Sequence, residues 1–158
     1  MKRFMELVKS CLTEVKEHMP WDMQERMDAN PDVLIVDVRE PYEYEVMHIA
    51  NSLNIPRGIL ESACEWEFEE TEPELVRARN RELIVVCRSG QRSVLAAHSL
   101  QVLGFKNVAS LDTGIRGWKD YDLPLQDSGS LDVDLDDADE YFTTHLREDQ
   151  LKPANWVD

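Results

Sequence analysis

Two nearly continuous apolar runs restrict most strongly the folds that this 158-residue chain can adopt. They are "VLIVDV" at residues 33–38 and "ELIVVC" at residues 82–87. Neither alternates apolar with polar side chains, so each is expected to be a strand covered on both faces, as in a parallel sheet. "NVASL" at residues 107–111 is expected to be a third strand.

Helical patterns lie before, between and after these runs. Helices are expected over residues 21–29, from Pro73, over residues 92–103 and in "TGIRGWKDYDL". The spacing of six apolar residues predicts an amphipathic helix over residues 2–19, ending near Pro20: Phe4, Leu7, Val8, Cys11, Leu12 and Val15. Strands that alternate with helices predict parallel pairing and an α/β sandwich.

The charge balance excludes several classes of partner. The chain has 17 Lys and Arg against 32 Asp and Glu, a formal net charge of −15. Such a surface repels phosphate backbones and anionic membranes, so we expect no nucleic acid and no membrane as partners. No apolar run approaches the roughly 18 residues of a membrane span, and no signal-peptide pattern opens the sequence. A cytoplasmic location is expected.

The cysteines argue against metal and disulfide chemistry. Cys11, Cys64 and Cys87 are far apart, and with the four histidines they give no zinc-ligand spacing. An odd number of scattered cysteines also makes a disulfide framework improbable. We therefore expect no metal and no organic cofactor.

The residues after the second strand suggest chemistry. Cys87 ends the strand, Arg88 and Arg92 follow within five positions, and Gly90 permits a left-handed turn before the next helix. Strand ends that lead into helix starts are where α/β proteins place their sites. Backbone N–H groups at a helix start and nearby cations favour the thiolate form of a cysteine. The loop therefore predicts that Cys87 is an anion or carries one.

Two blocks of sequence give this loop a context. They are "VLIVDVREPYEYEVMHIANSLNIPRG" and "LIVVCRSGQRSVLAAHSLQVLGFKNVASLDTGIRGW". In content, order and spacing they resemble the rhodanese-like sulfurtransferase family, across roughly residues 20–125. The resemblance implies a three-layer sandwich, with a mostly parallel central sheet and helices on both faces.

The resemblance also implies an activity. Cys87 would take the sulfane sulfur of thiosulfate or of a persulfide, hold it as a persulfide, and pass it to cyanide or a thiol. A protein is the other acceptor that the resemblance allows. The substrate-binding residues would be Arg88, Ser89, Gly90, Gln91 and Arg92.

Individual roles follow from position in the loop. Arg88 is expected to point outward and bind thiosulfate. Arg92 is expected to close the loop, pair internally and stabilise the bound anion. Ser93 is expected to cap the following helix, with a catalytic role as the alternative. Asp37 and Arg39, after the first strand, are expected to brace the loop as a buried pair.

Two other functions are open to a chain of this kind. Cysteine-loop phosphatases and arsenate reductases share the fold but use Cys-x5-Arg, whereas Cys87 to Arg92 is Cys-x4-Arg. Val86 also stands where those enzymes place His. A non-enzymatic regulatory or docking module is the second alternative, although such family members usually lack the cysteine.

The pattern predicts three parts: an N-terminal helix (1–19), a rhodanese-like domain (20–125) and an acidic extension (126–158). From Asp127 onward the chain has ten acidic and two basic residues. We therefore expect the extension to be an ordered but dispensable arm that adds little core. The first helix either covers the core or pairs with its copy in a homodimer.

Overall fold

A five-stranded sheet forms the centre of the computed structural model, which describes residues 1–157. The strand order is β1-β5-β4-β2-β3, and every neighbouring pair is parallel. The strands are β1 (Lys16–His18), β2 (Leu34–Asp37), β3 (Leu53–Asn54), β4 (Glu82–Val86) and β5 (Asn107–Leu111). The three strands expected from the sequence are confirmed as β2, β4 and β5.

Successive side chains of the central strands enter two different cores. Leu34 and Val36 of β2 lie in the first core, and Ile35 between them lies in the second. β4 divides its side chains in the same way. Because side chains alternate across a pleated strand, a continuous apolar run is required when both faces are covered.

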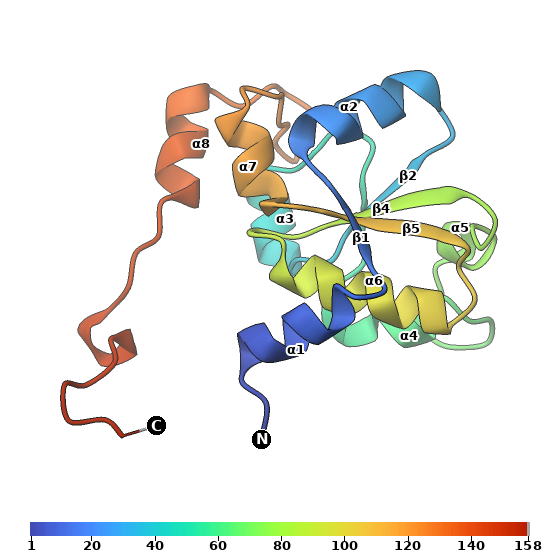
Figure 1. Ribbon diagram of the computed structural model, residues 1–158. Coiled ribbons are helices and arrows are strands. Elements are labelled where there is room, and N and C mark those ends of the chain that lie inside the picture. The colour runs from blue at the N-terminus through green and yellow to red at the C-terminus, as the bar shows by residue number, and fades with distance from the viewer. Residues whose placement is uncertain (158) are drawn as a thin grey trace.

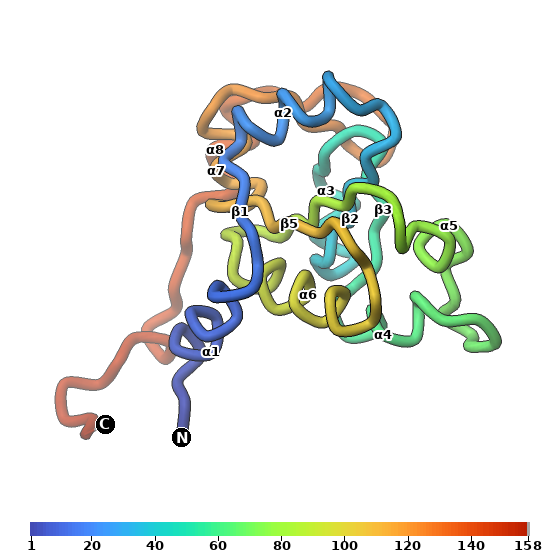
Figure 2. The backbone as a smooth tube through the Cα atoms, turned by 45° about the vertical axis from the view of Figure 1, so that its right-hand side comes forward, coloured from blue at the N-terminus to red at the C-terminus, as the bar shows by residue number. Residues whose placement is uncertain are grey.

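Helices cover both faces of the sheet, one layer on each side (Figures 1 and 2). The first core is covered by α1 (Phe4–Cys11), α4 (Leu60–Ala63), α5 (Pro73–Val76) and α6 (Gln91–Val102). The second core is covered by α2 (Pro20–Ala29), α7 (Gly114–Asp120) and α8 (Leu135–Phe142). The short helix α3 (Pro41–Val46) follows β2, and two 3-10 turns span Arg57–Ile59 and Glu148–Gln150. The α/β three-layer sandwich is thereby confirmed.

The helix expected over residues 2–19 is wrong in its second half. α1 ends at Cys11, and after a turn residues 16–18 form β1, which pairs with β5 at the edge of the sheet. Val15 belongs to the first core, as the apolar spacing predicted, but it reaches that core from the turn. Hydrogen bonding to the open edge of β5 outweighs the helical spacing here.

The C-terminal extension adds more to the core than its acidity predicts. Ala138 and Phe142 of α8 are 2% and 1% exposed and lie in the second core. The Asp134 carboxylate caps α8 by accepting from the N–H groups of Asp136 and Asp137. Residues 143–157, in contrast, are exposed and run away from the body (Figure 1). Core packing therefore continues beyond residue 125, as far as Phe142.

Within residues 1–157, no helix has the length and apolar character needed to cross a bilayer. In the same range, no group of three or more His, Cys, Asp or Glu side chains is arranged to hold a metal ion. All three cysteines are free thiols and buried.

Candidate active site

The Cys87 sulfur lies in a cradle of backbone N–H groups. Its Sγ accepts from the N–H of Gly90 at 3.1 Å and from that of Ser93 at 3.3 Å. The Cys87 side chain is buried, and its Sγ also lies 3.3 Å from Ser93 Oγ. Converging N–H groups stabilise negative charge on the sulfur or on an atom bound to it. Backbone N–H groups of the loop and of the first turn of α6 therefore converge on the Cys87 sulfur.

The turn of the loop depends on Gly90. This residue has φ +95° and precedes the first residue of α6 as its N-cap. A Cβ atom added there would lie 3.2 Å from both Leu111 O and Thr113 N. A left-handed backbone with so little space favours glycine.

Ser93 does not cap α6, contrary to the expectation. The helix begins at Gln91, so Ser93 lies inside its first turn, and its Oγ accepts from Ser110 Oγ at 2.7 Å. The hydroxyl groups of Ser110 and Ser93 thus form a buried chain that ends at the Cys87 sulfur. The side chain of Ser93 is committed to the sulfur site.

The start of α7 holds the cysteine loop through two backbone hydrogen bonds. The N–H of Ile115 donates to Cys87 O at 2.8 Å, and the N–H of Arg116 donates to Arg88 O at 3.1 Å. Gly114 has φ +65°, and a Cβ there would lie 2.5 Å from the Arg88 carbonyl oxygen. Sequence reasoning missed this residue, although a glycine at the helix start after the third strand was a visible signal.

Arg92 is paired internally, as expected. Its Nη1 lies 2.8 Å from Glu43 Oε2 and its Nη2 lies 3.0 Å from Glu43 Oε1. Burial alone would raise the pKa of Glu43, but hydrogen bonds from Arg92 and from the N–H of Glu40 hold it below its ordinary value. The Glu43 carboxylate correspondingly raises the pKa of Arg92. Glu43, which the sequence did not single out, anchors the end of the loop to α3.

Asp37 and Arg39 form the expected buried pair, and both side chains are 0% exposed. Arg39 Nη2 lies 2.8 Å from Asp37 Oδ2 and also donates to Met47 O at 2.8 Å. Arg39 Nη1 is buried with no hydrogen-bond partner among the described residues. The pair lies just after β2, where the N–H of Val38 donates to Val86 O beside the cysteine loop.

Arg88 points toward the C-terminal extension. Its Nη2 lies 3.3 Å from Tyr141 O and 3.5 Å from Thr143 O, and its guanidinium carbon lies 5.3 Å from the centre of the Phe142 ring. These partners carry no formal charge, and Arg88 forms no ion pair with a carboxylate among residues 1–157. The expectation of an outward-pointing side chain did not include this contact with α8.

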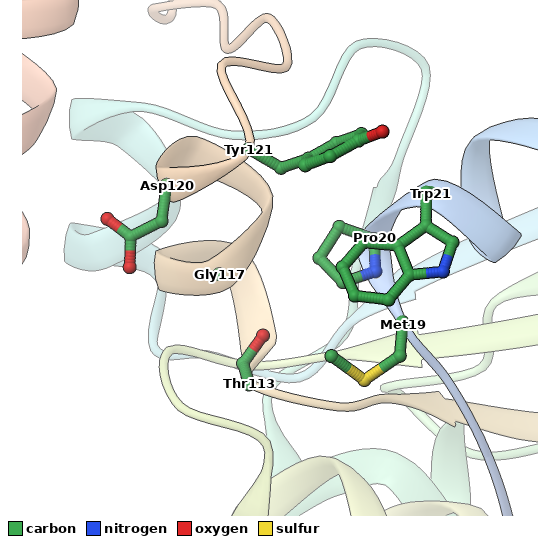
Figure 3. A pocket seen from close by; sticks show the side chains of 7 residues that line it. All are labelled: Met19, Pro20, Trp21, Thr113, Gly117, Asp120 and Tyr121. Carbon is green, nitrogen blue, oxygen red and sulfur yellow. The ribbon is translucent and has the colours of Figure 1, made fainter.

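Ser89 and Gln91 occupy the outer side of the loop. They line a hollow of about 340 Å³ together with four residues of the α7 region: Thr113, Arg116, Gly117 and Asp120. A second hollow, of about 250 Å³, adjoins it between α2 and α7 (Figure 3). The second hollow is lined by Met19, Pro20, Trp21, Thr113, Gly117, Asp120 and Tyr121. Cys87 lines neither hollow, and only the first is bordered by residues of the cysteine loop.

Comparison with known proteins gives this geometry a family. A putative sulfur carrier protein from Bacillus subtilis is 36% identical over 95 residues, which is 60% of this chain and 46% of that protein. A putative mitochondrial thiosulfate sulfurtransferase from Schizosaccharomyces pombe is 31% identical over 63% of this chain and 72% of that protein. A tRNA uridine(34) hydroxylase from Pectobacterium carotovorum is 32% identical over 71% of this chain.

The chain spans less than half the length of the first and third of these relatives, 46% and 32%. Among solved structures, a protein of unknown function from Rhodopseudomonas palustris, described as a possible tyrosine phosphatase, superimposes with a TM-score of 0.73. It is 26% identical, and the match covers 80% of this chain and 96% of that one. The family model of the rhodanese-like domain matches residues 20–121. This range contains the whole cysteine loop and four of the five strands, β2 to β5. The chain belongs to the rhodanese-like domain family.

Proposed function

We propose that the chain is a sulfurtransferase that moves sulfane sulfur from thiosulfate or a persulfide to a thiophilic acceptor through a persulfide on Cys87. The observation that carries the proposal is the N–H cradle around the Cys87 sulfur. Such a cradle suits a nucleophilic thiolate and equally the terminal anion of Cys–S–S⁻.

The reaction takes two displacement steps. The Cys87 thiolate attacks the outer sulfur of thiosulfate, a new S–S bond forms, and sulfite leaves with the electron pair of the old bond. In the second step cyanide or a thiolate attacks the terminal sulfur of the persulfide. The Cys87 thiolate then leaves with the electron pair, and the enzyme returns to its starting state.

The neighbouring residues supply charge and shape. Arg88 provides a full positive charge for an anionic donor. Within the loop, Gly90 supplies an N–H to the sulfur, and Ser89 and Gln91 flank it in the sequence. Arg92 fixes the end of the loop through Glu43. Ser93 contributes both an N–H and a hydroxyl at the sulfur, and the Asp37–Arg39 pair braces the adjoining strand end.

Phosphatase activity is the second candidate, because one similar structure is described as a possible tyrosine phosphatase. The loop length argues against it: four residues separate Cys87 from Arg92, and enzymes that encircle a phosphate use five. The Arg92 side chain is also occupied by two hydrogen bonds to Glu43. We therefore place sulfur transfer first.

The test is mass spectrometry of the intact protein after incubation with thiosulfate. Sulfur transfer predicts a gain of one sulfur atom on Cys87, its removal by cyanide, and no gain on Cys87→Ser. A panel that adds a low-molecular-weight persulfide as donor and thiols as acceptors identifies the preferred pair. No gain of sulfur from any donor would contradict the proposal and leave a docking module as the better explanation.

A further inference from the structure

The C-terminal end of α8 contacts the cysteine loop directly through Arg88. The guanidinium group lies 3.3 Å from Tyr141 O, and its carbon lies 5.7 Å and 5.3 Å from the ring centres of Tyr141 and Phe142. Thr143 O is a further acceptor at 3.5 Å. Three consecutive residues, 141–143, thus surround one side of the guanidinium.

α8 is itself fixed to the body of the protein. Phe142 is 1% exposed and lies in the second core with Ala138, and its ring meets that of Tyr141 edge to face at 5.1 Å. Lys119 of α7 binds Asp139 of α8, with 2.7 Å between Nζ and Oδ1. Residues 141–143 are therefore held in place by packing, and they hold Arg88 in turn.

Tyr141 lies at the rim of the same site. Burial raises the pKa of its hydroxyl, and the nearby charges that act on it are those of Arg39, Glu43, Arg88 and Tyr42. Two of these groups, Glu43 and Arg88, belong to the network around the cysteine loop. The end of α8 therefore meets the cysteine loop at Arg88, and α3 meets it at Arg92 through Glu43.

The chemistry of the contact matters because it leaves the charge of Arg88 available. Carbonyl oxygens and aromatic rings orient a guanidinium group without neutralising it, whereas a carboxylate would compete with an anionic substrate. A free arginine side chain loses rotamer freedom when it binds a ligand, and a side chain already held loses less. α8 meets the requirements for orienting Arg88 before the donor binds.

We propose that residues 141–143 orient Arg88 for the anionic sulfur donor, with Phe142 as the positioning residue that fixes them. The inference rests on the proposed function and extends it to the C-terminal extension. It assigns donor specificity to a segment outside residues 20–121, the part matched by the family model. The donor class it favours carries a compact terminal anion, as thiosulfate does.

A double-mutant cycle in the full chain tests the proposal, using the wild type, Phe142→Ala, Arg88→Ala and the double variant. Thiosulfate:cyanide kinetics should show that Phe142→Ala raises KM for thiosulfate by about threefold to tenfold, with kcat within about twofold. In the Arg88→Ala background, the Phe142 change should alter KM no further, because the guanidinium group that Phe142 positions is absent. Additive effects on KM, or a loss confined to kcat, would overturn the proposal.

Two controls separate positioning from folding. Leu135→Ala changes an exposed residue of the same helix and should leave KM unchanged. Phe142→Leu keeps apolar bulk in the core but removes the ring near Arg88, so it should also raise KM for thiosulfate. This variant replaces Phe142→Ala in the cycle if Phe142→Ala does not fold. An unchanged KM in a folded Phe142→Leu protein whose melting temperature is near that of the wild type would contradict the role of the ring.

A binding measurement keeps the inference independent of turnover. Calorimetry of thiosulfate with Cys87→Ser, which cannot form a persulfide, should show weaker binding when Phe142→Leu is added. Equal affinities, or no thiosulfate binding to Cys87→Ser, would overturn the inference. Failure of the proposed function has a different signature, since wild-type Cys87 would gain no sulfur from any donor.

Discussion

Arg92 and Glu43 form a two-pronged ion pair that joins the first turn of α6 to α3, with N···O distances of 2.8 Å and 3.0 Å. Glu43 is buried, whereas about a third of the Arg92 side chain is exposed. The pair is the point where the end of the cysteine loop is fastened to a neighbouring helix. Loss of either partner therefore affects both the loop and the stability of the protein.

The first prediction concerns pH. The pKa of Glu43 is lower in the folded protein than in the unfolded chain, so its stabilising contribution is complete above the unfolded value of about 4.3 and is lost as pH falls through the folded value. Glu43→Gln should cost about 1–2 kcal/mol at neutral pH and should lose less stability than the wild type below about pH 4. Urea unfolding at several pH values measures both. Parallel pH profiles for the two proteins would contradict this account.

The second prediction concerns the three cysteines. Cys87→Ser should abolish sulfur transfer, whereas Cys11→Ser and Cys64→Ser should retain most of it. Burial raises the pKa of the Cys64 thiol, and its Sγ donates to Glu61 O, so it is a poor nucleophile at neutral pH. Steady-state kinetics of the three variants, with circular dichroism to confirm folding, make the comparison. An equally inactive, folded Cys64→Ser would refute a single catalytic cysteine.

The third prediction concerns selectivity between sulfur and phosphate. Because the loop is Cys-x4-Arg and Arg92 is bound to Glu43, kcat/KM for thiosulfate:cyanide transfer should exceed that for hydrolysis of an aryl phosphate by at least about tenfold. Both activities are measured on one preparation, with Cys87→Ser as the blank. A phosphatase value at or above the sulfurtransferase value would make the loop-length argument wrong.

The fourth prediction concerns Gly114. Gly114→Ala places a methyl group about 2.5 Å from Arg88 O at a residue with φ +65°, so the loop must shift. The expected cost is roughly 1–3 kcal/mol of stability, together with a marked loss of kcat. Gly58→Ala is the matched control, because its new Cβ has nothing within 4 Å. Wild-type activity in Gly114→Ala would show that α7 does not shape the loop.

The fifth prediction divides the C-terminal extension. Deletion from residue 145 onward removes exposed chain, so stability should change by less than about 0.5 kcal/mol and thiosulfate transfer should stay near wild type. Deletion from residue 135 onward also removes Ala138 and Phe142 from the second core, and should cost about 2 kcal/mol or more. Urea unfolding of both truncations gives the answer. Equal stability of the two would contradict a structural role for α8 and would agree with the dispensable arm expected from the sequence.

The central strands and the cysteine loop were predictable from the sequence because their signals are local. A continuous apolar run identifies β2 and β4, and a cysteine between a strand and a helix identifies the loop. Arg92 could be predicted to pair internally, but Glu43 could not be named, because 49 residues separate the two. The packing of α8 could not be predicted for a similar reason. The acidic composition of the extension predicts solvent exposure, but the contact of Phe142 with the second core depends on residues far away in the sequence.

The pairing of β1 with β5 has a consequence for how the protein is made. Lys16 lies beside Ala109, so the first strand finds its neighbour only after roughly 90 further residues have left the ribosome. Until then β4 presents an open edge to any other extended chain, which is a hazard during synthesis. The cysteine loop cannot reach its final conformation before this point either, because the α7 N–H groups that bind its carbonyls follow β5 in the sequence. The sulfur site of the nascent protein is therefore complete only after β5 and the start of α7 have been synthesised.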